Sequence, residues 1–417
     1  MPPHDKGEII RDGHIIRIRK DIHAQDMRYF AAVLHRTTER RKYPNVTLDF
    51  VECDFMAEAC MLPLLPLIVR YRQKNVDFKF LPPENDNLNR LFQNANWAHF
   101  IEPAQYDKSD FREKHVPAMQ FDSDSQNEAV DNIVQCVLGG LEEDRDYFVA
   151  LEWALNEITD NVLNHAESEV GGFVQATIYK DSVEFVVADA GMGIPKSLRM
   201  ENDKPGALRD AIEPKVSKYK TGNRGTGLFG TYRMALLSEG VFVINSDYAW
   251  LSHASGKTRS GKNNIPYNGT SILCRIPMGT PNLLQKALGH NQPFDYMEKK
   301  FETGEENEMI LTIKEHKQKL GSRSGGKFVH TLLKNMLREV EKGNAKHVVI
   351  DFADIGVISS SFADEVFGRL YVELGPFYQR WLQFQHTDST IEYLIDRAIV
   401  QRWTADKEIN GAKGELP

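Results

Sequence analysis

The chain has 417 residues, of which 41% are hydrophobic, 10% aromatic and 26% charged, with a formal net charge of −8. This length is too great for one hydrophobic core, so we expect two or three compact domains. The acidic balance provides no basic face for sequence-independent binding of nucleic acid, so nucleic acid is not an expected partner.

Residues 1–120 predict a small α/β domain. Segments 46–51 (VTLDFV) and 76–81 (VDFKFL) have the apolar content of strands, and the apolar run at 59–69 between them predicts a helix. That run is too short to span a bilayer, and charges interrupt every apolar pair of residues 1–20. We therefore expect a soluble protein without a membrane partner.

Residues 121–280 form the second expected domain. Helix-capping residues at 123–128 open two helical patterns that run to about residue 167. Four strands are then predicted, at 173–180, 182–190, 241–245 and 270–277. Residues 190–227 are polar and glycine-rich, and 253–269 (HASGKTRSGKNNIPYNG) is typical of a solvent-exposed hairpin loop.

Residues 309–417 form the third expected domain, after a linker at 281–308 that mixes proline, glycine and acids. Its predicted elements are strands at 309–314 and 347–352 and helices at 324–342 and 362–374, which again indicate α/β structure. The segments VTLDFVECDF and VVIDFADIGVISSSF, each followed by a helix, are similar to one another, so we predict a repeated supersecondary unit.

The chain contains four scattered cysteines without a C-x-x-C pair: Cys53, Cys60, Cys136 and Cys274. Such a pattern is typical of reduced thiols in a cytosol, so we expect a cytoplasmic location. Neither a zinc site nor a disulfide framework is predicted by this spacing.

The helix expected over ALNEITDNVLNHA (154–166) has one unusually polar face. Spacings of three and four residues place four of its side chains within an arc of about 100°, namely Glu157, Asp160, Asn161 and Asn164. Such a face is either solvated or a binding site.

Two glycine-containing segments favour a binding site. In DAGMG (189–193), which follows an apolar strand, the glycines let the backbone approach a planar ligand, and Asp189 can accept a hydrogen bond from an exocyclic amine. In GNRGTGLFGTYRM (222–234), a glycine cluster leads into a helical pattern, whose free N–H groups favour phosphates. Each motif alone is also common in ordinary turns.

In order and spacing, residues 125–280 resemble the GHKL family, the ATPase domain of gyrase, MutL, histidine kinases and bacterial anti-sigma-factor kinases. The four family boxes look like Glu157-x-x-x-Asn161, Asp189-x-Gly191-x-Gly193, Gly225-x-Gly227 and Gly269-Thr270. His165 and the Gly-Leu-Phe of the third box look most like the anti-sigma-factor kinase branch. The resemblance implies an α+β sandwich whose mixed sheet is covered by helices on one face.

The resemblance also implies ATP as ligand and Mg²⁺ as cofactor. Asn161 would bind Mg²⁺ through its amide oxygen, Glu157 would orient or deprotonate an attacking water or hydroxyl, and Asp189 would read the adenine amino group. Residues 194–224 would be a mobile lid over the phosphates. The remaining implied nucleotide contacts are Asp160, Asn164, Gly191, Gly193, Lys218, Lys220, Arg224, Gly225, Thr226, Gly227, Leu228 and Thr270.

The C-terminal domain resembles a bacterial STAS-like family of uncharacterised function and, more distantly, the STAS domains of anti-sigma-factor antagonists. This resemblance implies Ser361 as a phospho-acceptor, although Ser359 and Phe362 depart from the antagonist pattern. Serines before a helix are also explained as N-caps, the interpretation that we favour. Residues 1–120 would be a further STAS-like domain for docking or dimerisation.

Three functions stay open at this point. The first is a regulatory switch in which slow ATP hydrolysis controls the docking of the STAS-like domains or of a protein partner, with a homodimer as one form of partnership. The second is a serine kinase that acts in cis at Ser361 or in trans, and the third is an ATP-bound adaptor without turnover. Glu157 argues against the adaptor, and the altered turn at Ser361 argues against the cis kinase.

Overall fold

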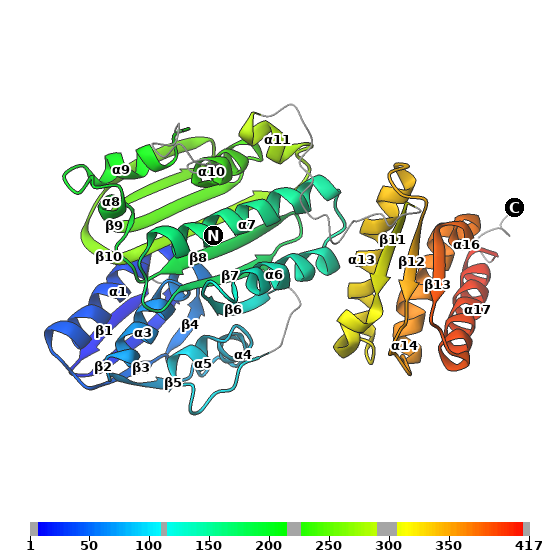
Figure 1. The fold of residues 1–417 in the computed structure, drawn as a ribbon. Coiled ribbons are helices and arrows are strands. Elements are labelled where there is room, and N and C mark those ends of the chain that lie inside the picture. The colour runs from blue at the N-terminus through cyan, green and yellow to red at the C-terminus, as the bar shows by residue number, and fades with distance from the viewer. Residues whose placement is uncertain (1–6, 110–114, 215–226, 290–306, 412–417) are drawn as a thin grey trace, which may run out of the picture. The chain divides into compact units, whose positions relative to one another are not determined.

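The computed structural model describes residues 7–109, 115–214, 227–289 and 307–411, and it confirms the α/β class (Figure 1). The chain divides into two compact units: Met1–Cys136 with Ala150–Phe294, and Val137–Val149 with Asp295–Pro417. None of the helices in the described residues has the length and apolar character that a membrane span requires.

The N-terminal part of the first unit is a five-stranded mixed sheet. Its strands are β1 (Glu8–Asp12), β2 (Ile15–Ile22), β3 (Asn45–Asp49), β4 (Cys53–Met56) and β5 (Asp77–Leu81), in the order β1-β2-β3-β5 with β4 paired to β2. Only β1 runs antiparallel to its neighbour. The helices are η1 (Ala24–Asp26), α1 (Met27–His35), η2 (Arg36–Arg40), α2 (Glu58–Met61), α3 (Leu64–Gln73), α4 (Asp86–Asn94) and α5 (Trp97–Ile101).

The first unit also contains a second sheet, in the order β6-β7-β8-β10-β9. Its strands are β6 (His115–Phe121), β7 (Gly172–Ile178), β8 (Ser182–Asp189), β9 (Val241–Ala254) and β10 (Lys257–Pro277). All four pairings are antiparallel, which corrects the mixed sheet expected here, because β7–β8 and β9–β10 are hairpins. The helices of this part are α6 (Gln126–Gly140), α7 (Arg145–His165), α8 (Ile194–Ser197), α9 (Lys204–Ala211), α10 (Gly227–Leu237) and α11 (Leu283–Leu288).

The second sheet is covered on both faces. Strands β7 and β8 are buried along their whole length, which requires cover on each side because successive side chains point to opposite faces. Helices α6, α7 and α10 lie over one face (Figure 1). On the other face Phe173 and Val186 join the hydrophobic core of the N-terminal sheet, and the Trp97 indole donates to Gln175 Oε1 at 2.8 Å. Residues 1–120 therefore share their core with this sheet.

Two segments expected to be irregular are regular structure. The predicted exposed loop at 253–269 lies mostly in strand β10, which pairs with β9 up to a tight turn at Ser255 and Gly256. The first half of β10 is polar because both of its faces are largely exposed, and not because it is a loop. The range 281–308 contains helix α11, in which Leu283, Leu284 and Ala287 are buried, and residues 290–306 lie outside the described structure.

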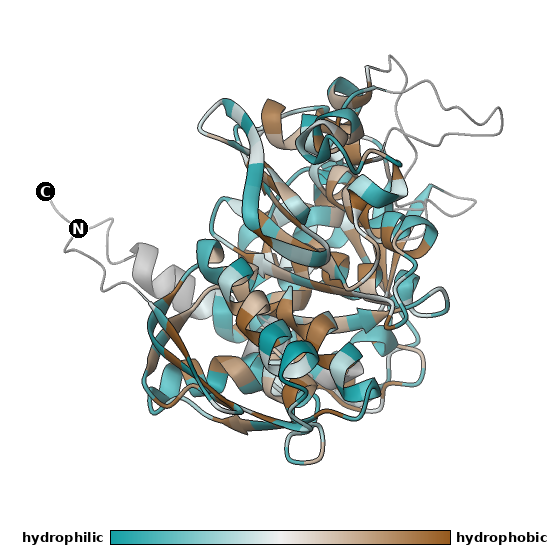
Figure 2. Ribbon diagram, turned by 90° about the vertical axis from the view of Figure 1, so that its left-hand side faces the viewer, coloured by the Kyte–Doolittle hydropathy of each residue, from teal (hydrophilic) through white to brown (hydrophobic). Residues whose placement is uncertain are grey.

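The second unit contains a parallel sheet in the order β11-β12-β13, formed by β11 (Glu308–Thr312), β12 (His347–Asp351) and β13 (Leu382–Gln385). Its helices are η3 (Ile313–Lys319), α13 (Arg323–Glu341), α14 (Ser360–Ala363), η4 (Asp364–Gly368), α15 (Arg369–Leu374), η5 (Gly375–Phe377), α16 (Tyr378–Trp381) and α17 (Ser389–Gly411). In the part of the first unit that faces the viewer in Figure 2, hydrophobic residues lie along the strands and polar residues are frequent on the helices.

The predicted repeat is present in the structure. The parallel strands β2, β3 and β5 alternate with helices in the same order as β11, β12 and β13. Middle strands β3 and β12 each end in an aspartate that accepts from the backbone two residues later: Asp49 from Val51 N at 3.2 Å, and Asp351 from Ala353 N at 2.9 Å.

The next residue of each copy repeats the same backbone contact. Phe50 N donates to Leu81 O and Phe352 N donates to Gln385 O, each at 3.0 Å and each to the last residue of the third parallel strand. Both phenylalanines are fully buried. Local geometry, and not only a short sequence similarity, therefore relates the two copies.

Candidate functional site

The polar face of α7 is partly buried, as a site would require. Glu157 is half-buried, and burial, with the nearby charge of Asp160 as the smaller cause, raises its pKa to about 7. A carboxylate with this pKa exchanges a proton readily near neutrality. Such a shift would not arise on a fully solvated helix face.

The third glycine motif lies directly against Glu157. A Cβ atom on Gly227, the first residue of α10, would lie 2.1 Å from Glu157 Oε2. Gly230, one turn later, allows equally close packing against the ring of Trp153 on α7. Glycines at both positions therefore bring the start of α10, with its free N–H groups, to the polar face of α7.

The other three predicted residues of α7 differ in environment. Asp160 is exposed and accepts from Gln126 Nε2 of α6 at 2.7 Å, and Asn164 is exposed. Asn161 is half-buried, and its side-chain nitrogen is buried without a hydrogen-bond partner among the described residues. Buried polar atoms normally have partners, so Asn161 has the character of a group awaiting a ligand.

Asp189 is the last residue of strand β8. Its side chain is 2% exposed, and its Oδ1 atom accepts from Gly191 N at 2.7 Å and from Thr270 N at 3.3 Å. Burial raises its pKa to about 6, although both backbone hydrogen bonds and the charge of Arg70 oppose that change. The carboxylate is thus ionised at neutral pH and oriented by the backbone.

The glycines of DAGMG serve the packing of their own loop. A Cβ atom on Gly191 would lie 2.0 Å from Ala166 O at the end of α7, and Met192 N donates to the same oxygen at 2.8 Å. Gly193 has a φ of +80°, which other residues adopt only with strain. This packing adds to the role expected for these glycines, which was close approach to a planar ligand.

Ser246 of β9 joins the second and fourth motifs, and the sequence interpretation missed it. Its hydroxyl accepts from Ile194 N at 2.9 Å, donates to Gly269 O at 3.0 Å and lies 3.1 Å from Thr270 Oγ1. No signal in the sequence marked it, because Ser246 stands between the polar residues Asn245 and Asp247, and only its burial in the structure sets it apart.

The structure therefore brings the predicted residues together in two neighbouring groups. The first group contains Glu157 and Gly227, with Leu228 following on α10, and Asn161 lies one turn further along α7. The second contains Asp189, Gly191, Gly193 and Thr270, and it meets the C-terminal end of α7 at Ala166. The predicted contacts Lys218, Lys220, Arg224, Gly225 and Thr226 lie outside the described residues.

The first part of the expected mobile lid is packed structure. Helix α9 rests on the β9–β10 hairpin, where Lys204 forms an ion pair with Asp247 and Arg209 Nη1 donates to Ser260 Oγ at 2.9 Å. The rest of the expected lid falls within residues 215–226, which lie outside the described structure.

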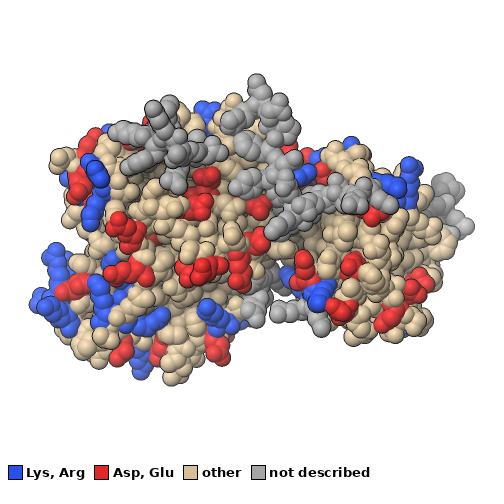
Figure 3. Space-filling view, viewed as in Figure 1, with Lys and Arg blue, Asp and Glu red and all other residues tan. Residues whose placement is uncertain are grey.

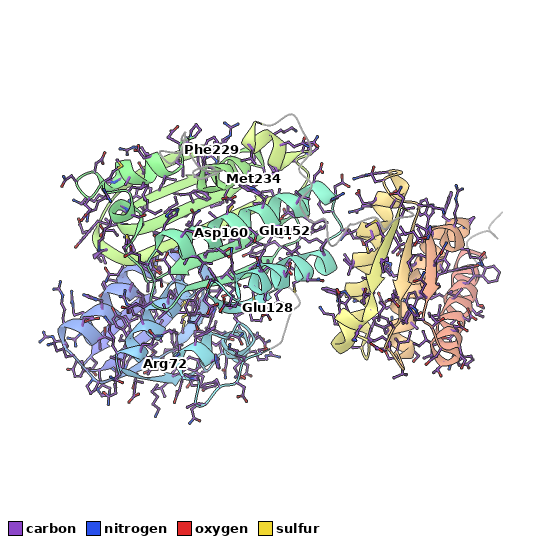
Figure 4. All side chains as sticks on the ribbon, viewed as in Figure 1. Arg72, Glu128, Glu152, Asp160, Phe229 and Met234 are labelled. Atoms are coloured by element: carbon purple, nitrogen blue, oxygen red, sulfur yellow. The ribbon has the colours of Figure 1, made fainter. Side chains whose placement is uncertain are left out.

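Acidic side chains gather over α6 and α7 (Figure 3). Asp160 and Glu152 lie on α7 and Glu128 lies on α6, whereas the labelled residues of α10, Phe229 and Met234, are apolar (Figure 4). An anionic ligand on this face would need a cation to offset the repulsion.

The serine turn of the second unit is a helix cap, as favoured from the sequence. Ser359 Oγ accepts from Phe362 N at 3.0 Å and lies 3.1 Å from Ser361 Oγ. Ser361, the predicted phospho-acceptor, is half-buried, whereas Ser360 is exposed. The first copy of the repeat has Glu58 in the place of Ser360, eight residues after the equivalent phenylalanine.

Comparison with models of known protein families matches residues 324–392 to a STAS-like domain of unknown function (DUF4325). The C-terminal unit thus contains a STAS-like domain, as the sequence predicted. No curated protein matches the chain.

Proposed function

We propose that residues 121–280 bind ATP together with Mg²⁺ and that slow ATP hydrolysis makes the protein a cytoplasmic regulatory switch for its STAS-like domains or a protein partner. The observation that carries this proposal is the buried carboxylate of Asp189, whose Oδ1 is held by two backbone N–H groups. The four cysteines are free and buried, which agrees with a reducing compartment.

Asp189 supports recognition of adenine. Because Oδ1 already accepts from Gly191 and Thr270, Oδ2 is the oxygen available to an exocyclic amine. Adenine presents a donor at that position and guanine presents a carbonyl, which an ionised carboxylate would repel. The Asp189 carboxylate would therefore favour ATP over GTP.

The start of α10 and the polar face of α7 support binding of the phosphates. Among the described residues α10 begins at Gly227, which packs against Glu157, and the first N–H groups of a helix have no partner within it. Asn161 would hold Mg²⁺ through its amide oxygen, because a neutral amide oxygen is a ligand type that Mg²⁺ accepts. When bound, Mg²⁺ would offset the charge between the phosphates and the acidic face.

Glu157 supports the hydrolytic step. In its ionised form it accepts a proton from a water molecule whose oxygen bonds to the terminal phosphorus, and the bond to the bridging oxygen breaks to release ADP. Its pKa of about 7 leaves much of it ionised at neutral pH. A serine hydroxyl in place of water would give the alternative, a protein kinase.

Replacing Asp189 with asparagine is expected to weaken ATP binding about 10- to 100-fold. The amide oxygen will still accept the hydrogen bonds from the two backbone N–H groups. The NH₂ group will then face the amino group of adenine, so that two donors oppose one another. The ratio of ATP to GTP affinity should fall in the same variant. Titration calorimetry with each nucleotide and Mg²⁺ at neutral pH measures both effects.

Asp181→Asn is the control, since Asp181 is exposed at the opposite end of strand β8. It should leave both affinities at the wild-type value. Wild-type protein that binds neither nucleotide would overturn the proposal, and equal loss in both variants would remove Asp189 from the site.

Replacing Asn161 with alanine is expected to abolish most of the Mg²⁺ dependence of ATP binding, because the amide oxygen of the proposed ligand is lost. The measurement compares ATP affinity in Mg²⁺ with that in EDTA. Asn156→Ala, on a different face of α7, should retain the wild-type difference. Full magnesium dependence in Asn161→Ala would contradict the metal assignment.

A serine kinase is the second candidate, because exposed Ser360 and half-buried Ser361 begin a helix in the STAS-like domain. Helix starts accept phosphate groups readily. The fate of the terminal phosphate of ATP, free in solution or on the chain, separates this candidate from hydrolysis, and an adaptor would show neither.

A further inference from the structure

Two side chains outside all four sequence motifs hold the backbone that carries Asp189. Tyr267 of β10 places its hydroxyl 3.1 Å from Asp189 O, and Arg70 of α3 donates through Nη1 to Ala190 O at 2.7 Å. These are successive carbonyl groups at the start of the DAGMG loop. Fixing both of them fixes the direction in which the Asp189 side chain leaves the strand.

Tyr267 reaches this position because β10 is irregular there. Its pairing with β9 shifts register on both sides of Tyr267, and Gly269 follows with a φ of +137°. A Cβ atom on Gly269 would lie 2.1 Å from Asp189 O, so the chain crosses directly over that peptide. Bulges of this kind redirect a side chain, and here the redirected ring is fully buried.

The same hydroxyl contacts the N-terminal domain. It lies 2.8 Å from Pro63 O, in the junction between α2 and α3, and one proton serves this oxygen and Asp189 O. Burial raises the pKa of Tyr267 far above its usual value, so the phenol stays a donor.

Arg70 lies on the same face of α3 as Pro63, since a separation of seven residues is close to two helical turns. The contacts from Tyr267 to Pro63 and from Arg70 to Ala190 therefore form two parallel links between α3 and the loop. Further along the same interface, Glu58 at the start of α2 accepts from Thr177 Oγ1 of β7. A shift of α3 would move both links.

We propose that Tyr267 and Arg70 are positioning residues through which helix α3 of the N-terminal domain sets the orientation of Asp189 and hence the affinity for the adenine base. This inference rests on the proposed function. It makes the N-terminal domain a part of the nucleotide site, so that a partner that displaces α3 changes ATP affinity without touching the nucleotide.

Tyr267→Phe tests the first link, because it removes only the hydroxyl. ATP affinity is expected to fall about 3- to 10-fold, with a lower ratio of ATP to GTP affinity. Thr37→Val is the control, since it removes a buried hydroxyl that donates to Val33 O at 2.8 Å on α1, away from the site. It should leave both quantities unchanged.

Arg70→Met and Arg70→Lys test the second link. Their readout is the pH dependence of ATP affinity, which a loss of packing alone would not change. Among the described residues, Arg70 from α3 and Tyr267 from β10 are the titratable groups that interact with Asp189. Wild-type ATP affinity should decline as pH falls through about 6, the pKa of Asp189. Loss of the positive charge in Arg70→Met should move that decline to higher pH, whereas Arg70→Lys should restore its position.

The outcomes separate this inference from the proposed function. ATP binding that depends on Asp189 but is unchanged in Tyr267→Phe and in both Arg70 variants would overturn the coupling and leave the nucleotide site intact. Absence of ATP binding in the wild type would overturn the nucleotide site itself. If Tyr267→Phe does not fold, the pH profiles of ATP affinity in the two Arg70 variants test the coupling between α3 and Asp189.

Discussion

Replacing Glu157 with glutamine is expected to lower ATP turnover about 100- to 10,000-fold while ATP binding is retained. Glutamine keeps the size of the side chain beside Gly227 but cannot accept the proton of the attacking water. The loss of a negative charge near the phosphates should, if anything, tighten binding. The measurement follows γ-labelled ATP with Mg²⁺ into free phosphate or onto the chain.

The same experiment separates the chemical alternatives. Free phosphate that disappears in Glu157→Gln supports hydrolysis, whereas label on the chain that disappears in Ser361→Ala or Ser360→Ala supports the kinase. Full turnover in Glu157→Gln would show that another group accepts the proton. Binding without turnover in the wild type would leave only the adaptor.

The pH profile gives a further check on Glu157. Only its ionised form accepts a proton, so wild-type turnover should rise as pH increases through about 7, its raised pKa. Asp160→Asn is the matched variant, because Asp160 contributes to that raised pKa by charge repulsion. Its turnover should rise at lower pH than that of the wild type.

The sequence predicted those parts of the site that depend on local spacing. Residues Glu157 and Asn161 share a helix face by periodicity alone, and the apolar strand before Asp189 placed its carboxylate at a strand end. The α/β character of the C-terminal unit followed equally from short patterns. These are features that 3.6-residue and 2-residue periods encode.

Long-range contacts could not be predicted in the same way. Tyr267 lay in a segment interpreted as a loop, because its strand is polar and interrupted by glycines. Arg70 belongs to none of the sequence motifs and follows the apolar run at 59–69. Each acquires its role from a partner that is distant in sequence. The second covered face of the β7–β8 sheet was missed for the same reason.

Replacing Arg28 with methionine is expected to destabilise the first unit by about 3–5 kcal/mol, the largest effect on stability predicted for this chain. Arg28 lies on α1 and is 7% exposed. Its guanidinium donates to Asn245 Oδ1 at 3.1 Å, to Asp247 O at 2.7 Å and to Ile265 O at 3.0 Å, and it also bonds to Ala249 O. One side chain thus supplies donors to β9 and β10.

The physical cause is the set of acceptors that would be left behind. Methionine fills a similar volume but donates nothing, so carbonyl oxygens that are buried beneath α1 lose their partners. Burial lowers the pKa of Arg28 to about 10, so the guanidinium is still protonated at neutral pH. Lysine keeps the positive charge but lacks the planar guanidinium with its several fixed donors. Arg28→Lys should therefore recover only part of the lost free energy of unfolding.

Denaturant unfolding gives the free energy, and hydrogen exchange locates the change, with faster exchange expected along β9 and β10. Arg17→Met is the control, because Arg17 is partly exposed and pairs with Asp12 at 2.9 Å and with Asp49 at 3.6 Å, and such surface pairs contribute about 0–1 kcal/mol. Equal stability of Arg28→Met and Arg17→Met would mean that α1 does not hold the two strands. Arg28 binds Asn245 and Asp247, the two neighbours of Ser246 in β9. Ser246 in turn contacts Thr270 and the backbone of Ile194 after the DAGMG loop. Arg28→Met should therefore also weaken ATP binding, because this part of β9 loses its contacts with α1.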